Sequence, residues 1–78
     1  MNAEEKIIRI IENILGDPSV SVTPESNLMD DLGLNSLDAV DAVVAIEEEF
    51  HIEIPDQLLR KMITVQDMID IVRERAEG

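Results

Sequence analysis

The stretch DDLGLNSLD, residues 30–38, decides the fold, because an irregular segment gives way there to an acidic amphipathic helix predicted over residues 37–50. Ser36 stands immediately before that helix. A serine nucleophile needs a base within hydrogen-bond reach, but the one histidine, His51, lies fifteen residues further on, about 22 Å along a helix. A catalytic triad is therefore excluded. We expect Ser36 either to cap the helix or to carry a phosphate ester, which the helix N-terminus favours.

The predicted helix over residues 37–50 has two unlike faces. At about 100° per residue, its buried arc gathers Ala39, Ala42, Val43, Ile46 and Phe50. The opposite face carries a stripe at i, i+4, i+7 and i+11, formed by Leu37, Asp41, Val44 and Glu48. Val40 falls at the rim between the two faces. Exposed aliphatic side chains framed by acids are typical of a docking surface, although isolated exposed apolar residues are also ordinary.

The chain before residue 30 predicts one helix and a long connection. Asn2, with Glu5 three residues on, is a capping-box-like start for a helix over residues 3–15, which Gly16 is suited to end. The connection should pack across the ends of the other helices, because it contains the apolar residues Val20, Val22, Leu28, Leu32 and Leu34. Thr23-Pro24-Glu25 predicts a short turn within it.

Two more helices are predicted after residue 50. Pro55 disfavours helical geometry at Ile54, so a short helix follows over residues 56–62. Thr64 and Asp67 form a capping pair for a last helix. Its apolar stripe comprises Val65, Met68, Ile69 and Val72, and residues 73–78 are expected to fray. The fold class is therefore all-α, a small four-helix bundle with three longer helices, a short third helix and a long first loop.

Length and composition bound the possible functions. With 78 residues the chain predicts one domain over residues 1–78, too small for a deep enclosed active site. Cysteine is absent, so thioester chemistry would need an imported thiol. Aromatic residues make up 1% of the chain and apolar residues 45%, which favours an aliphatic helical core. No apolar run reaches membrane-span length and the amino terminus lacks a signal-peptide pattern, so we expect a cytoplasmic protein without membrane insertion.

Charge is distributed unevenly. The formal net charge is −12, and the segment between Arg9 and Arg60 contains twelve acids and no lysine or arginine. Such a field repels nucleic acid and anionic membranes and speeds encounter with proteins that carry basic patches. Acids can equally serve solubility alone. The charge therefore argues against nucleic-acid binding, and by itself it fits basic protein partners and simple solubility equally well.

A designed metal site and acid–base chemistry are not predicted, although the acids should bind divalent cations weakly. A calcium loop beginning at Asp31 would place Ala42 at its twelfth position, where a bidentate glutamate is required. His51 has no cysteine and no second histidine as a partner for zinc. Asp38 and Asp41 lie on a solvated helix with no sign of a pocket that would perturb their pKa values. We therefore expect no catalytic residue and no designed metal site.

The sequence resembles the acyl carrier proteins. The resemblance is carried by DLGLNSLD (residues 31–38), EEEF (47–50) and IPD (54–56), and TVQD (64–67) extends it over nearly the whole chain. In that family a serine in an aspartate-serine-leucine motif carries 4′-phosphopantetheine, whose terminal thiol holds acyl groups as thioesters. The resemblance implies that Ser36 is the attachment site and that coenzyme A supplies the arm.

The resemblance also implies partners and a pocket. A phosphopantetheinyl transferase, and acyl-chain synthesising and transferring enzymes with basic patches, would bind a monomeric carrier at Asn35, Leu37, Asp38, Asp41, Val44, Glu47 and Glu48. The acyl chain would shelter among Val43, Ile46, Phe50, Ile54, Met62 and Ile69. The pathway expected is fatty-acid or related biosynthesis.

Four positions depart from the family pattern. Asn35 replaces the usual aspartate before the serine, Gln57 and Arg60 replace acids, and Ala42 is smaller than usual. These departures favour a specialised carrier. A carrier of aminoacyl or polyketide units, an acidic adaptor that never bears the arm and, more distantly, a calcium sensor remain as alternatives.

Overall fold

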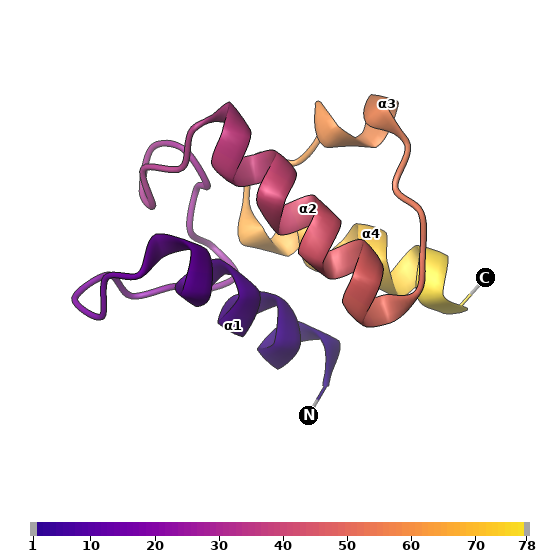
Figure 1. Cartoon of the computed structure of the whole chain (residues 1–78), viewed down its shortest axis with the longest axis horizontal. Helices are drawn as coiled ribbons and strands as arrows, with labels where there is room; N and C mark the ends of the chain where they lie inside the picture. Colours follow the sequence, from indigo (N-terminus) through magenta and orange to yellow (C-terminus); the bar gives the residue numbers. More distant parts are fainter. Residues whose placement is uncertain (1, 78) are drawn as a thin grey trace.

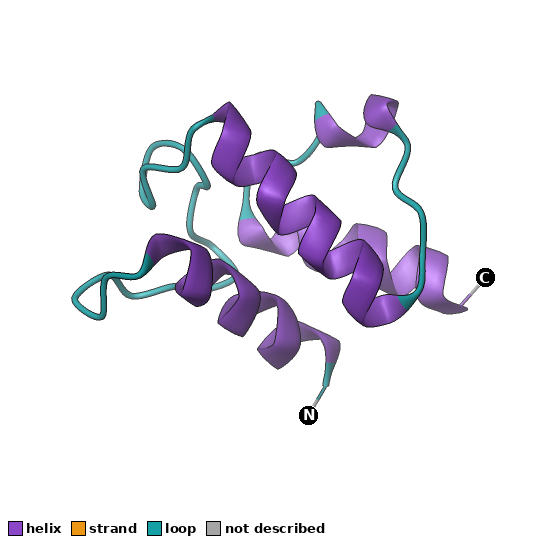
Figure 2. Ribbon diagram, in the orientation of Figure 1, coloured by secondary structure: helices purple, strands orange, loops and turns teal. Residues whose placement is uncertain are grey.

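The structure is a computed structural model that describes residues 2–77. Within these residues the chain forms four helices joined by loops (Figure 1). They are α1 (Ala3–Leu15), α2 (Ser36–Phe50), α3 (Asp56–Leu59) and α4 (Val65–Glu77). Figure 2 shows that the remaining described residues are loops and turns, of which the connection before α2 is the longest. The predicted all-α class, with three longer helices, a short third helix and a long first loop, is confirmed.

The ends of α1 follow the sequence closely. The Asn2 side-chain oxygen accepts the Glu5 N–H at 2.9 Å, and Gly16, with φ of 63°, donates its N–H to the Glu12 carbonyl. Glycine adopts this left-handed conformation without steric cost, which lets the chain leave the helix. The predicted helix over residues 3–15 is confirmed.

The start of α4 is fixed by a reciprocal cap. The Asp67 N–H donates to Thr64 Oγ1 at 3.2 Å, and the Asp67 carboxylate accepts the N–H groups of Thr64 and Ile63, each at 2.9 Å. The charged segment from residue 73 belongs to α4, which continues to Glu77, and the expected fraying of this last turn stays a prediction. Arginine, glutamate and alanine in this segment all favour helix, which offsets its exposure. Gly78 lies outside the described residues.

The third helix is shorter than predicted, ending at Leu59 instead of residue 62. Lys61 and Met62 donate to carbonyls three residues back, which tightens the chain into a turn. The turn is needed because the Ile63 carbonyl accepts the Leu28 N–H at 2.9 Å. This contact with the first connection, next to an isolated bridge between Asn27 and Thr64, redirects the chain before the helix can lengthen.

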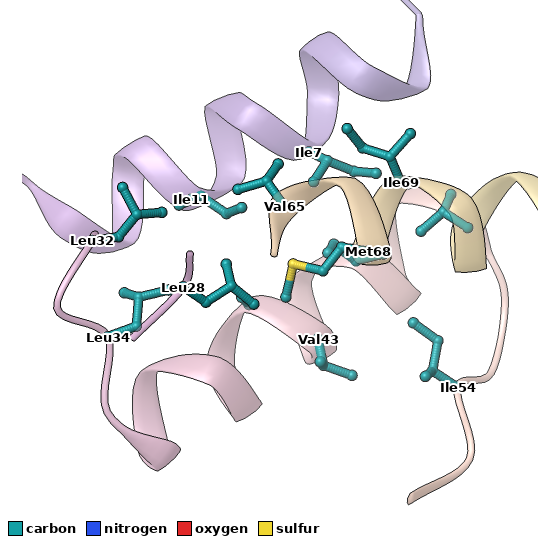
Figure 3. Close-up of a cluster of buried hydrophobic side chains, with 13 residues drawn as sticks. Ile7, Ile11, Leu28, Leu32, Leu34, Val43, Ile54, Val65, Met68 and Ile69 are labelled. Atoms are coloured by element: carbon teal, nitrogen blue, oxygen red, sulfur yellow. The ribbon is translucent and has the colours of Figure 1, made fainter. Parts of the chain in front are cut away.

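The core lies between α1, α2 and α4 and is entirely aliphatic. In Figure 3, Ile7 and Ile11 of α1 lie next to Val65 and Ile69 of α4. Buried hydrophobic residues come from all three long helices and from the connections: Ile7, Ile11, Leu28, Leu32, Leu34, Ala42, Val43, Ile46, Ile54, Val65, Met68, Ile69 and Val72. The predicted stripe of α4 is thus wholly buried. In the predicted arc of α2, Ala39 and Phe50 are only half-buried.

Packing places α1 against both α2 and α4, as Figure 1 shows. The first connection is fastened to this core by its leucines, as its apolar pattern predicts, and the expected turn at residues 23–26 is closed by the Ser26 N–H on the Thr23 carbonyl. Within residues 2–77, no helix combines the length and hydropathy that a membrane span requires.

Candidate functional site

Ser36 is the first residue of α2, one residue earlier than the predicted start of that helix. The capping residue is Asn35, whose side-chain oxygen accepts the Asp38 N–H at 2.9 Å while its own N–H donates to the Asp38 carboxylate at 3.3 Å. The alternative that Ser36 caps the helix is therefore wrong. Its hydroxyl is exposed and free for other chemistry.

The loop before Ser36 is built to present this serine at a fixed place. Leu32 and Leu34 are buried, and the Leu34 N–H donates to the Leu28 carbonyl at 3.0 Å. Between the two leucines, Gly33 has a φ of 72°, a value that favours glycine. Two buried anchors and a glycine turn thus bring the chain to the surface at Asn35, directly before Ser36.

The acids of this loop form part of its backbone hydrogen bonding. The Asp31 carboxylate accepts the Asn27 N–H at 2.7 Å, and the Asn27 side chain accepts the N–H groups of Met29 and Asp30 at 3.1 and 2.9 Å. Among the described residues, no group of three or more histidine, cysteine, aspartate or glutamate side chains is placed to hold a metal ion. The loop carboxylate thus has a role in ordering the chain that leads to Ser36.

A cavity of about 220 Å³ adjoins Ser36. Its walls come from the first connection, α2, the segment around α3, and α4, and comprise Leu28, Met29, Ser36, Ala39, Val40, Val43, Leu59, Arg60, Met62 and Met68. Ser36 and Arg60 are the only polar side chains in this set. An apolar hollow with a few polar groups is typical of a small-molecule site.

The residues predicted to form an acyl pocket are divided by the structure. Val43 and Met62 line the cavity beside Ser36. Ile46 and Ile69 are fully buried in the core, and Ile54 borders a different groove. Phe50 is half-buried and faces the Lys6 ammonium, which lies 5.6 Å from the centre of its ring.

Several cavity residues were not anticipated from the sequence, namely Leu28, Met29, Ala39, Leu59, Arg60 and Met68. Val40, predicted to lie at the rim between the buried and exposed faces of α2, also lines the cavity. Helical periodicity could identify the α2 positions. No local signal places residues 28 and 59 in the wall of one cavity, because this arrangement depends on how the first connection folds back.

The predicted docking stripe on α2 lies at the surface. Leu37 is 76% exposed and Val44 is 46% exposed, and Asp41 and Glu48 are also exposed. Two further large apolar side chains are exposed outside α2, Met29 at 57% and Ile63 at 58%. Such a set of exposed apolar residues beside acids fits a protein interface.

Three other residues predicted to bind partners have local structural roles. Asn35 and Asp38 form the cap described above. The Glu47 carboxylate accepts the Ile54 N–H at 2.7 Å and so holds the connection between α2 and α3. Glu47 also lines an open groove of about 580 Å³, which is bordered by Val44, Glu47, Glu48, Ile52, Glu53, Ile54 and Pro55.

Electrostatics along α2 are dominated by unpaired acids. Among the side chains that the structure describes, a single ion pair is formed, between Lys6 and Glu49 at 3.7 Å, on the side of α2 that faces α1. The exposed carboxylates of Asp41 and Glu48 lack such partners among the described residues. Elsewhere, the backbone N–H groups of Thr64 and Ile63 hold the pKa of Asp67 below its ordinary value. The Ser19 hydroxyl and N–H likewise lower the pKa of Asp17.

Comparison with known proteins gives one family and a consistent set of structures. The family model described as a phosphopantetheine attachment site matches residues 5–72. An acyl carrier protein from Thermotoga maritima is 33% identical, with a TM-score of 0.80 over 94% of this chain and 85% of that one. A protein from Mycobacterium tuberculosis, described as a candidate acyl carrier protein, is 32% identical, with a TM-score of 0.88 over 94% of this chain and 97% of that one.

Proposed function

Because this chain belongs to the acyl carrier protein family, whose members carry covalent 4′-phosphopantetheine, we propose that Ser36 is the residue to which the arm is attached. The family consists of carriers without catalytic activity, and this chain is one of them. The single observation that carries the assignment to Ser36 is its position, exposed at the start of α2 and lining an apolar cavity.

Attachment proceeds by transfer from coenzyme A. The Ser36 hydroxyl oxygen forms a bond to the phosphorus that bears pantetheine, the pyrophosphate bond to the adenosine part breaks, and 3′,5′-ADP leaves as the serine proton is released. A phosphopantetheinyl transferase catalyses this step in the family. The chain itself contributes an accessible hydroxyl and an ordered helix start, not a base.

The start of α2 suits the resulting phosphodiester. Asn35 satisfies the Asp38 N–H, whereas the N–H groups of Ser36 and Leu37 have no hydrogen-bond partner among the described residues. Free N–H groups and the positive end of the helix dipole both favour an anion there. This supports a modified Ser36 over an unmodified one.

The cargo we propose is an acyl group held as a thioester at the end of the arm. The cavity beside Ser36 would shelter its apolar part against Val43, Met62 and Met68. At about 220 Å³ it is smaller than the roughly 300–1,000 Å³ of drug-sized ligand sites, so it fits a short acyl chain. A longer chain would have to displace Ile46 and Ile69, both fully buried, to reach the rest of the predicted pocket.

The partners we propose are enzymes of fatty-acid or related biosynthesis that carry basic patches, in addition to the transferase. They would contact the exposed stripe of Leu37, Asp41, Val44 and Glu48, because its unpaired acids attract cationic surfaces and its aliphatic side chains can be buried on docking. Glu47 and Asp38 would serve this surface indirectly, through the backbone groups that they hold.

The deciding experiment is intact mass after incubation with coenzyme A and a general phosphopantetheinyl transferase. We expect the wild type to gain one arm and Ser36→Ala to gain none. Asn35→Asp is the matched variant, because aspartate caps a helix as well as asparagine and restores the charge usual in the family. If it alone is loaded, the carrier proposal holds and a dedicated transferase is required.

Loading of none of these proteins would instead favour an acidic adaptor that docks through α2 without the arm. If the arm is gained, the group that it carries decides between acyl, aminoacyl and polyketide cargo. That group is identified by incubation with candidate activating enzymes, followed by mass analysis.

A further inference from the structure

We infer that Arg60 is an arm-binding residue, whose guanidinium pairs with the phosphodiester formed on Ser36. The inference rests on the proposed function. Arg60 directly follows α3, whereas Ser36 begins α2, yet both residues line the same cavity. An anion attached to Ser36 would therefore face the one cation in the cavity wall.

The position of Arg60 within the cavity matches the attachment end of the arm. Arg60 is exposed, so it lies at the rim, whereas Val43, Leu28 and Met68 are buried and form the inner wall. The phosphodiester would also lie at the rim, because it is bonded to the exposed Ser36. The thiol end and its cargo would extend toward the apolar interior.

Arg60 is available for such a pairing. It forms no ion pair with any residue of the described chain, and no other lysine or arginine occurs between Arg9 and Arg60. The carboxylates of Asp31 and Asp38, which lie on either side of Ser36 in the sequence, accept backbone N–H groups. A guanidinium forms strong, directional hydrogen bonds with phosphate oxygens, which an ammonium does not match.

A carboxylate at the far end of the cargo is a less suitable partner for Arg60. That carboxylate would have to return to the rim, or be buried among apolar walls at a large desolvation cost. The phosphodiester is bonded directly to Ser36, so it stays at the rim and does not have to be buried among apolar side chains. The phosphodiester is also present whatever the cargo.

Pairing would connect two elements that are otherwise weakly joined. The helix α3 has four residues and none of them is buried. A bond between Arg60 and an anion on α2 would hold this segment against the start of α2. The apo and holo proteins should therefore differ in the order of residues 56–62, and in little else.

The test compares wild type, Arg60→Gln and Lys61→Gln, each in apo and holo form, by amide hydrogen exchange. Lys61→Gln is the matched control, because it removes the same charge from the next residue, which is exposed and does not line the cavity. In wild type we expect the arm to slow exchange over residues 56–62 by about two- to fivefold, the range of an exposed ion pair. Lys61→Gln should keep this protection and Arg60→Gln should lose it.

Intact mass separates the possible failures. A protein that does not gain the arm on Ser36 fails the proposed function, whereas a loaded Arg60→Gln with the same protection as loaded wild type overturns the role of Arg60. The phosphorus NMR shift of the holo protein gives a second reading, which should move in Arg60→Gln and not in Lys61→Gln. If Arg60 affects only a succinyl-loaded arm and not the holo or butyryl forms, its partner is the cargo carboxylate and the inference is wrong.

Discussion

Between α1 and α4 the core is closed, whereas between α2 and α3 it is hollow. On the closed side, Ile7, Ile11, Val65 and Ile69 have no exposed surface. On the open side, α3 has no buried residue, and the cavity beside Ser36 has exposed and half-buried residues around an inner wall of the buried Leu28, Val43 and Met68. The difference indicates that the two sides have separate tasks. The closed side stabilises the bundle, and the open side contains the cavity in which we propose that the acyl group lies.

The largest effect is expected from truncating one core side chain on each side. Ile69→Ala should lower the free energy of unfolding by about 2–5 kcal/mol, because it leaves a cavity in a closed core. Leu59→Ala should lower it by only about 1 kcal/mol, because Leu59 is half-buried and already borders a hollow. Urea unfolding followed by circular dichroism measures both. Equal losses at the two sites would remove the distinction between the sides.

Filling the hollow should stabilise the protein and impair its function. Ala39→Leu adds apolar volume to the cavity wall on α2, and we expect a gain of about 1 kcal/mol in the apo protein. Thermal unfolding of apo and acyl-loaded protein then measures how much the acyl group stabilises the fold. That increment should shrink in Ala39→Leu and persist in Val44→Leu, which adds a methylene on the outer face. A destabilised apo Ala39→Leu would show that this space is not available.

The cap of α4, formed by the Asp67 carboxylate, should make a pH-dependent contribution to the free energy of unfolding. Asp67→Ala should lower the free energy of unfolding by about 1 kcal/mol at pH 7, because the N–H groups of Thr64 and Ile63 lose their acceptor. Since the folded pKa of Asp67 is depressed below its ordinary 3.8, this stabilisation is present above pH 3.8 and is lost as the pH falls through the folded value.

Urea midpoints of wild type and Asp67→Ala between pH 7 and pH 2.5 test that prediction. The difference in urea midpoint between wild type and Asp67→Ala should be constant near pH 7 and should become smaller below pH 3.8. Asp70→Ala, on the same helix, removes only a side-chain bond to Gln66 and should cost less. A gap that stays constant over the whole range would exclude a contribution from the Asp67 charge.

The smallest effect is expected at the end of α2, where the chain turns toward the open side. His51 has a φ of 55°, while the equivalent position after α1 is Gly16, with a φ of 63°. His51→Gly should therefore raise the free energy of unfolding by about 0.5 kcal/mol, the relief of strain being partly offset by the greater freedom of glycine in the unfolded chain. His51→Ala should bring no gain. Urea midpoints at pH 7 compare the three proteins, and a loss of stability in His51→Gly would contradict the prediction.

The closed side could be predicted from the sequence almost completely. The first turns of α1 and α4 are capped by residues three apart in the sequence, Asn2 with Glu5 and Thr64 with Asp67. The buried residues of α4 repeat with helical spacing. The open side could not. The early end of α3 depends on the Ile63 carbonyl reaching Leu28, thirty-five residues away, and no spacing within the helix indicates it.

Of the candidate site, the sequence predicts the serine but not most of the cavity beside it. Ser36 is evident from its motif and from its place before an amphipathic helix. The cavity is not, because its walls come from four segments and only Val43 and Met62 of the predicted pocket belong to it. Asn35 appeared to be a departure from a family pattern, and in the structure it is the residue that caps α2.

The sequence by itself determined the helices, the aliphatic core, the acidic face of α2 and the serine at its start, because caps and periodicity act within a few residues of each other. Only the tertiary structure decided that Ser36 and Arg60 share one cavity and that Glu47 holds Ile54 instead of remaining a free surface charge. These contacts depend on where distant segments pack, and packing is set by the whole core at once.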